Sequence, residues 1–204
     1  MAAGTIGKLR GTIDAAVWTS DAHARFQEAV LAGNVWTGAN PSGTAVTTQA
    51  GVSATTPALT LYNPINSPVN LVLWQGTYAF QASPAAASSI ILAANLPTLA
   101  SVPTGPTSTT LASIWNNLLG TGVGAAQITG GPWGQCYRVA TLSAAPIAIR
   151  YPFGTTGAAA IGGASFTDFI DGLLVIGPGV AVSVQTSSAA SLCCSFTWEE
   201  VPIG

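Results

Sequence analysis

One stretch, residues 59–81, does the most to constrain the fold, because it reads as a strand, a turn and a second strand. In its second half, large apolar side chains recur at every second position, the period of a β-strand. We expect four of them to face a core together: Val72, Trp74, Tyr78 and Phe80. Pro64 and Pro68 mark the connection, since proline fixes φ and removes a ladder donor. The stretch therefore predicts a β-hairpin that supplies half of a sheet-on-sheet core.

Further short apolar runs extend this β pattern along the chain. Strands are expected at residues 45–49, 88–96, 137–142, 148–151, 173–176, 180–184 and 192–201. The last two runs predict a second hairpin that faces the core with Val180, Val182, Val184, Leu192, Cys194, Phe196 and Trp198. Residues 110–119 fit a helix or a strand, and residues 166–170 fit a short helical turn. About seven to nine strands with long connections predict an all-β, jelly-roll-like β-sandwich.

The beginning of the chain differs in composition from the remainder. Six of the twelve charged residues precede residue 29, and so does the only histidine, His23. We therefore expect residues 1–40 to form an N-terminal arm and residues 41–204 to form the sandwich domain.

The arm contains one pattern typical of a helix, over residues 20–32. Phe26 and Val30 belong to its narrow apolar stripe, and Trp18 and Trp36 flank it as possible anchors. One such helix must pack on something else to be stable. Two alternatives stay open: it packs across its own sandwich, or it reaches a neighbouring subunit or a different protein.

Charge is unusually scarce in this chain. Charged residues make up 6% of it, against about 25% in an ordinary soluble domain, and none lies between Glu28 and Arg138. The net charge of −2 and the lack of a basic patch argue against a nucleic-acid partner. No apolar run approaches the roughly 20 residues that span a bilayer, so no membrane partner is expected. A charge-poor surface suits contacts between subunits, which predicts a homo-oligomer; an exported β protein with a polar, uncharged coat is the alternative.

The residues that commonly carry catalysis are few. His23 is the sole imidazole, and no G-x-S-x-G motif is present. Asp168 and Asp171 could share a helix face and hold a hard cation, but two carboxylates in this context are more often a solvated turn. Glu199 and Glu200 should point to opposite faces of a strand. We predict no enzyme activity, no catalytic residue, no cofactor and no metal site.

Two further sets of side chains are candidates for redox or binding roles. The three cysteines, Cys136, Cys193 and Cys194, are odd in number and lack metal-ligand spacing, so small buried thiols are expected. Trp133 lies between Gly-Pro and Gly, which predicts an indole exposed on a loop as a sugar or partner contact. The predicted partner-binding residues are therefore Trp18, Phe26, Val30, Trp36 and Trp133.

Three segments also carry a resemblance: GKLRGTIDAAVWTSDAHARFQEAVLAGNVW, GQCYRVATLSAAP and FTWEEVP. In these segments the chain resembles virion proteins of tailed bacteriophages. The resemblance implies a jelly-roll structural protein, a capsid cement or decoration protein that binds itself as a dimer or trimer. It also implies binding to the major capsid protein or another virion protein. Its place would be the capsid surface or tail, after synthesis in the host cytoplasm. A receptor- or glycan-binding tip of a tail fibre is the alternative, and the resemblance assigns no residue a role.

Overall fold

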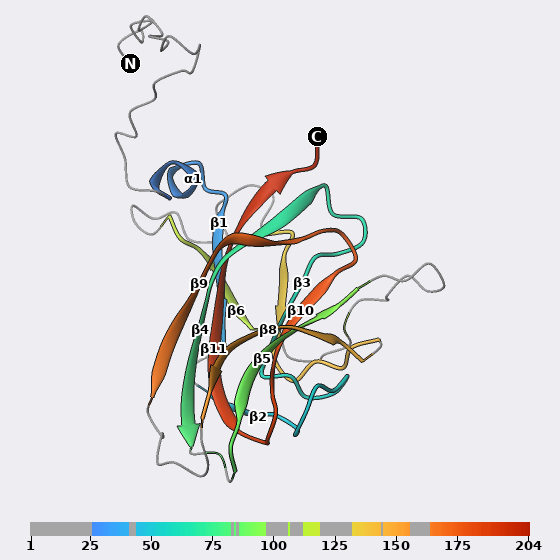
Figure 1. Ribbon diagram of the computed structural model, residues 1–204. Helices are drawn as coiled ribbons and strands as arrows, with labels where there is room; N and C mark the ends of the chain where they lie inside the picture. The colour runs from blue at the N-terminus through green and yellow to red at the C-terminus, as the bar shows by residue number, and fades with distance from the viewer. Residues whose placement is uncertain are drawn as a thin grey trace, which may run out of the picture.

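The computed structural model shows two antiparallel β-sheets packed face to face, with one short helix at the end of the sandwich where the last strand finishes (Figure 1). The structure describes residues 26–40, 44–82, 84, 86–96, 106, 112–118, 132–143, 145–155 and 164–204. An all-β sandwich with one short helix is therefore confirmed.

The spatial order of the strands in each sheet differs from their order along the chain. The six-stranded sheet runs β6 (Ser113–Asn116), β1 (Val35–Ala39), β11 (Ser191–Pro202), β4 (Val69–Ala82) and β9 (Ser165–Ile176), with β2 (Val46–Thr47) paired to β11. The five-stranded sheet runs β7 (Gln135–Tyr137), β3 (Leu59–Tyr62), β10 (Ala181–Thr186), β5 (Ser89–Asn95) and β8 (Ile147–Gly154). The helix is α1 (Gln27–Leu31).

The strand pairs are nested along the chain. β1 pairs with β11, β3 with β10, β4 with β9 and β5 with β8, as in one long antiparallel hairpin. That hairpin is rolled up, so that β11 also meets β4 and β10 also meets β5. Eight strands arranged this way form a jelly roll.

This topology corrects both predicted hairpins. β3 and β4 lie in different sheets, and so do β10 and β11. Each turn therefore carries the chain across the core to the opposite sheet. A proline-rich connection ends a strand, but it does not determine whether the next strand pairs with it.

The core lies between the inner faces of the two sheets. β11 contributes alternate residues, Leu192, Cys194, Phe196 and Trp198, as the sequence predicts. Val182 and Val184 of β10 join them, and half-buried Val180 packs against the cluster.

β4 departs from its predicted face. Trp74 is an extra residue in this strand, because Leu73 pairs with Trp198 while Gln75 pairs with Thr197. A bulge of this kind reverses which side chains point inward. Leu71 and Leu73 are buried before it, and Tyr78 and Phe80 after it. The prediction that Val72 and Trp74 share the core face with Tyr78 and Phe80 is therefore wrong.

β9 also differs from expectation, since residues 166–170 form a strand and not a helical turn. Asp171 and Gly172 interrupt its pairing with β4, with φ angles of 55° and 81°. Both are left-handed conformations, which glycine adopts readily and aspartate tolerates better than most residues. The ambiguous stretch 110–119 contains a strand, β6.

The expected division at residue 40 needs correction. β1 pairs with both β11 and β6, so the sandwich already includes residues 35–39. Of the helix predicted at residues 20–32, the structure describes five residues in α1, and residues 20–25 lie outside the described part of the chain.

Candidate interaction surface

The five predicted partner-binding residues fall into different environments. The prediction that Trp36 contacts a partner is wrong. Its side chain is 2% exposed and belongs to the core, and Trp36 of β1 pairs with Trp198 of β11. Val30 is half-buried on α1. Trp133 is exposed, as predicted, and Trp18 lies outside the described residues. The five therefore do not form one site.

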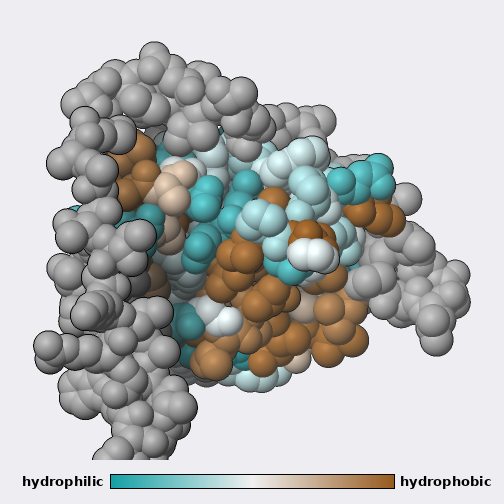
Figure 2. Space-filling model, turned by 90° about the horizontal axis from the view of Figure 1, so that it is seen from above, coloured by the Kyte–Doolittle hydropathy of each residue, from teal (hydrophilic) through white to brown (hydrophobic). Residues whose placement is uncertain are grey.

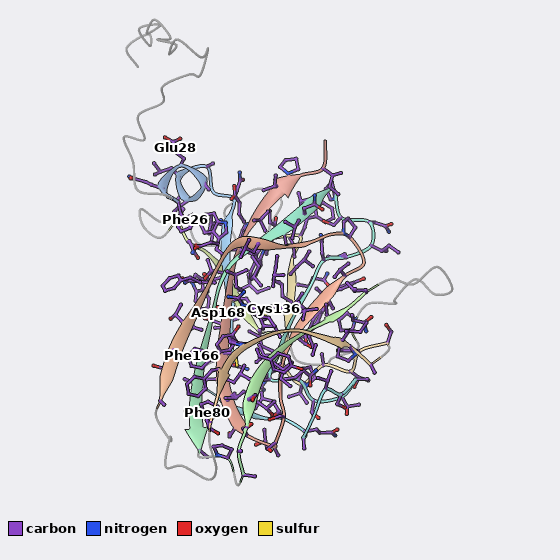
Figure 3. All side chains as sticks on the ribbon, in the orientation of Figure 1. Phe26, Glu28, Phe80, Cys136, Phe166 and Asp168 are labelled. Atoms are coloured by element: carbon purple, nitrogen blue, oxygen red, sulfur yellow. The ribbon has the colours of Figure 1, made fainter. Side chains whose placement is uncertain are left out.

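Phe26, at the start of α1, packs on the protein's own sandwich. Its ring stacks on Trp74 with centroids 4.1 Å apart and an interplanar angle of 27°. Figure 3 shows Phe26 on the side of α1 that faces the sheets. Such contacts between aromatic rings stabilise by about 0.5–1.5 kcal/mol beyond burial. Phe26 thus joins the start of the helix to the protein's own sandwich.

Glu200 holds the loop that carries Trp133. The backbone N–H of Gly134 donates to Glu200 Oε1 at 2.8 Å, and the indole N–H of Trp198 donates to the same oxygen at 3.4 Å. Burial raises the pKa of Glu200, while hydrogen bonds from the Gly134 and Trp133 backbone and from Trp198 oppose that rise. A buried carboxylate thus fixes the backbone beneath an exposed indole.

The acidic residues that the structure describes do not gather into a cation site. Asp168 binds Arg150, with Arg150 Nε and Nη2 each 2.8 Å from a carboxylate oxygen. Asp171 lies in the β9 bulge, so the predicted shared helix face does not exist. Within the described residues, no group of three His, Cys, Asp or Glu side chains could hold a metal ion.

The cysteines are free thiols. Cys136 and Cys194 are buried in the core, as predicted, while Cys193 is half-buried. Burial raises the pKa of each of the three thiols, most strongly for Cys136 and Cys194. Because the thiolate is the nucleophile, these groups are poor nucleophiles at neutral pH.

The feature that residue-by-residue reasoning missed is an apolar surface on an edge strand, which we call the edge surface. It consists of Ile147, Ile149 and Tyr151 of β8, exposed by 63%, 40% and 65% on the outer face of the five-stranded sheet. Arg150 points to the inner face instead, where it pairs with Asp168 of β9. On that inner side, Phe153 stacks on Phe166 with ring centroids 4.6 Å apart. Exposed aromatic and aliphatic side chains are typical of protein interfaces.

A second exposed apolar area lies beyond the β9 bulge, on the outer face of the six-stranded sheet. We call it the outer patch; it consists of Leu173 and Val175 of β9 with Val72 of β4. Val72 pairs with Val175, and Leu173 is exposed by 76%. Figure 2 shows hydrophobic residues gathered into a continuous area on the end of the molecule seen from above.

Comparison with known proteins returned no matching family model, no matching curated protein and no matching solved structure. In the part of the chain that the structure describes, no helix has the length and apolarity to cross a membrane. The two exposed surfaces and the Trp133 loop are therefore the features on which a functional proposal rests.

Proposed function

We propose that this protein is a structural subunit of a virus particle, a cement or decoration protein that self-associates and binds the shell through its edge surface. The observation that carries the proposal is the row of large apolar side chains exposed on β8. Water contact of such groups is unfavourable by roughly 25 cal/mol per Å², so covering them with another subunit is favourable.

The chemistry of the edge surface suits a protein partner. Tyr151 is of a residue type that concentrates in the energetically dominant centres of interfaces. Arg150 is already paired with Asp168, so burial under a partner would not leave its charge unpaired.

Three further observations support the proposal. The jelly roll recurs in capsid proteins, although a fold alone does not define a function. Charged residues are scarce after Glu28, which lowers the desolvation cost of burying the surface of the sandwich. The sequence segments that resemble tailed-phage virion proteins imply the same kind of role.

Electron microscopy of phage particles that carry this chain with a gold-binding tag tests the proposal. We expect label over the shell for the unsubstituted chain and loss of label for Tyr151→Asp. Ile65→Asp is the matched control, since Ile65 is exposed in the turn between β3 and β4, away from the edge surface. Absence of label from particles, or equal label with Tyr151→Asp, would contradict the proposal.

A second candidate function is favoured by one observation, the exposed Trp133 on a loop fixed by Glu200. A rigidly held indole is suited to stacking on a sugar ring, as at a receptor-binding tip of a tail fibre. A glycan array tests this candidate function. We expect the protein to bind a glycan, and we expect Trp133→Ala to abolish this binding and Tyr151→Asp to leave it unchanged. Label only at the tail tip in the microscopy would favour this candidate.

A further inference from the structure

The outer patch lies on the path of the chain that precedes α1. β1 begins at Val35, and α1 precedes it; at the start of α1, Phe26 reaches Trp74 in β4. In the sheet, β11 lies between β1 and β4. Followed backwards from β1, the chain therefore passes β11 and arrives at β4.

β9 is the next strand in that direction, and its outer side chains continue the apolar surface. Leu173 and Val175 are exposed by 76% and 56%, and Val72 lies between Val175 and Glu199 in one lateral row of the sheet. None of the described residues covers Leu173 or Val175 as Phe26 covers Trp74.

The segment that precedes Phe26 has the length and composition to cover this patch. Val17 and Trp18 are its bulkiest adjacent apolar pair, and eight positions separate Trp18 from Phe26. Eight residues span about 12 Å as a helix and about 26 Å when extended. Adjacent strands are about 4.8 Å apart, so either conformation reaches β9 from Trp74.

The distribution of charge also favours binding of this segment to the outer patch. The first 25 residues carry three cations and two carboxylates, whereas the remaining chain carries two cations and five carboxylates. Two of those carboxylates, Glu199 and Asp171, belong to strands of the outer face beside the patch. A segment of opposite net charge is thus attracted to this face.

We propose that residues 1–25 of the same chain bind across the outer face of β9, with Val17 and Trp18 covering Leu173 and Val175. The occupant is the chain's own segment because a tether this short gives an effective concentration in the millimolar range, which a second copy does not reach. The inference concerns a different face from the edge surface, so it does not depend on assembly.

Trypsin digestion of the full chain tests this proposal, because Lys8, Arg10 and Arg25 are cleavage sites within the segment. Binding protects these sites, and cleavage then follows transient release. We expect Leu173→Asp to raise the cleavage rate about tenfold, the change expected when burial of a leucine side chain is lost. Ile65→Asp is the matched control: it replaces an exposed apolar residue of the turn between β3 and β4, which belongs to neither surface, and its rate should equal that of the unsubstituted chain.

A second variant keeps the test independent of the sandwich's stability. Trp18→Ala alters only the segment, and it should also raise cleavage at Lys8, Arg10 and Arg25. Equal rates for Leu173→Asp and Ile65→Asp, or an unchanged rate for Trp18→Ala, would overturn the proposal. Protection that disappears on dilution would overturn it as well, because the occupant would then be a second copy.

Discussion

β5 lies between two strands whose apolar residues differ in exposure. On one side, β10 is buried at every position from Ala181 to Thr186. On the other side, no residue of β8 is buried, although Ile147 and Ile149 are as apolar as the valines of β10. The difference comes from position, because β10 is central in the sheet and β8 is at its edge.

The other sheet repeats the contrast around β4. Its neighbour β11 places Phe196 and Trp198 in the core, whereas its neighbour β9 exposes Phe169 to solvent. Buried apolar residues should therefore stabilise the fold, and the exposed apolar residues of edge strands should serve association. Substitutions on either side of this division test it.

The largest effect is expected from two phenylalanines on opposite sides of β4. Phe196→Ala in β11 should lower the free energy of unfolding by about 3–5 kcal/mol, because Phe196 is fully buried. Phe169→Ala in β9 should change it by no more than about 0.5 kcal/mol. Urea denaturation measures both changes. Similar losses of unfolding free energy for the two variants would contradict the division between buried and exposed apolar residues.

Close packing of the core predicts a smaller effect at a glycine. A Cβ at Gly38 would lie 2.9 Å from Cys136 Sγ and 3.2 Å from Trp198 Cζ3. Gly38→Ala should therefore cost about 1–3 kcal/mol in unfolding free energy. Gly177→Ala is the control, since the nearest atom to its Cβ would be Asn70 Oδ1 at 3.8 Å. Thermal unfolding that fails to separate the two variants would refute tight packing at Gly38.

The ion pair between the edge strands should contribute about 1 kcal/mol to stability. Arg150 is partly exposed, which weakens the pair, but its two-point geometry with Asp168 strengthens it. A double-mutant cycle with Arg150→Ala and Asp168→Asn measures this coupling. A coupling energy near zero would show that the two edges are joined by the Phe153–Phe166 contact alone.

The smallest effect is a pH dependence from Glu200. Burial raises its pKa above the ordinary value of 4.5, so between that value and the raised pKa the folded state binds more protons than the unfolded state. The free energy of unfolding then falls as pH rises through this window. Glu200→Gln removes the titration and should gain stability relative to the unsubstituted protein as pH rises.

Urea denaturation of both proteins at about pH 4 and about pH 7 measures this change. Glu199, whose pKa burial also raises, is present in both proteins and cancels in the comparison. A relative loss of stability for Glu200→Gln on raising the pH would contradict the assignment.

How far the fold follows from the sequence depends on the strand. In β11 the alternation is unbroken, so the inward row Leu192 to Trp198 was predictable. In β4 the same reasoning failed, because the bulge at Trp74 shifts the period without any mark in the residue types. Topology was also hidden, since Pro64 and Pro68 end a strand whether the chain then pairs or crosses to the other sheet.

The candidate surfaces show a similar limit. Trp133 was predictable, because flanking glycine and proline keep it out of a strand. The row Ile147, Ile149 and Tyr151 was not, because alternating apolar residues indicate one face of a strand without telling whether that face is inner or outer. The structure distinguishes the two, because Arg150 pairs with the core residue Leu92 and the row that alternates with it therefore faces outward.

Sedimentation of the full chain at about 1–100 µM tests whether the edge surface is an interface, because association depends on protein concentration. We predict a species of a multiple of 20.4 kDa that Tyr151→Asp reduces to 20.4 kDa and Ile65→Asp leaves intact. A chain that stays at 20.4 kDa over the whole range would contradict this role of the edge surface.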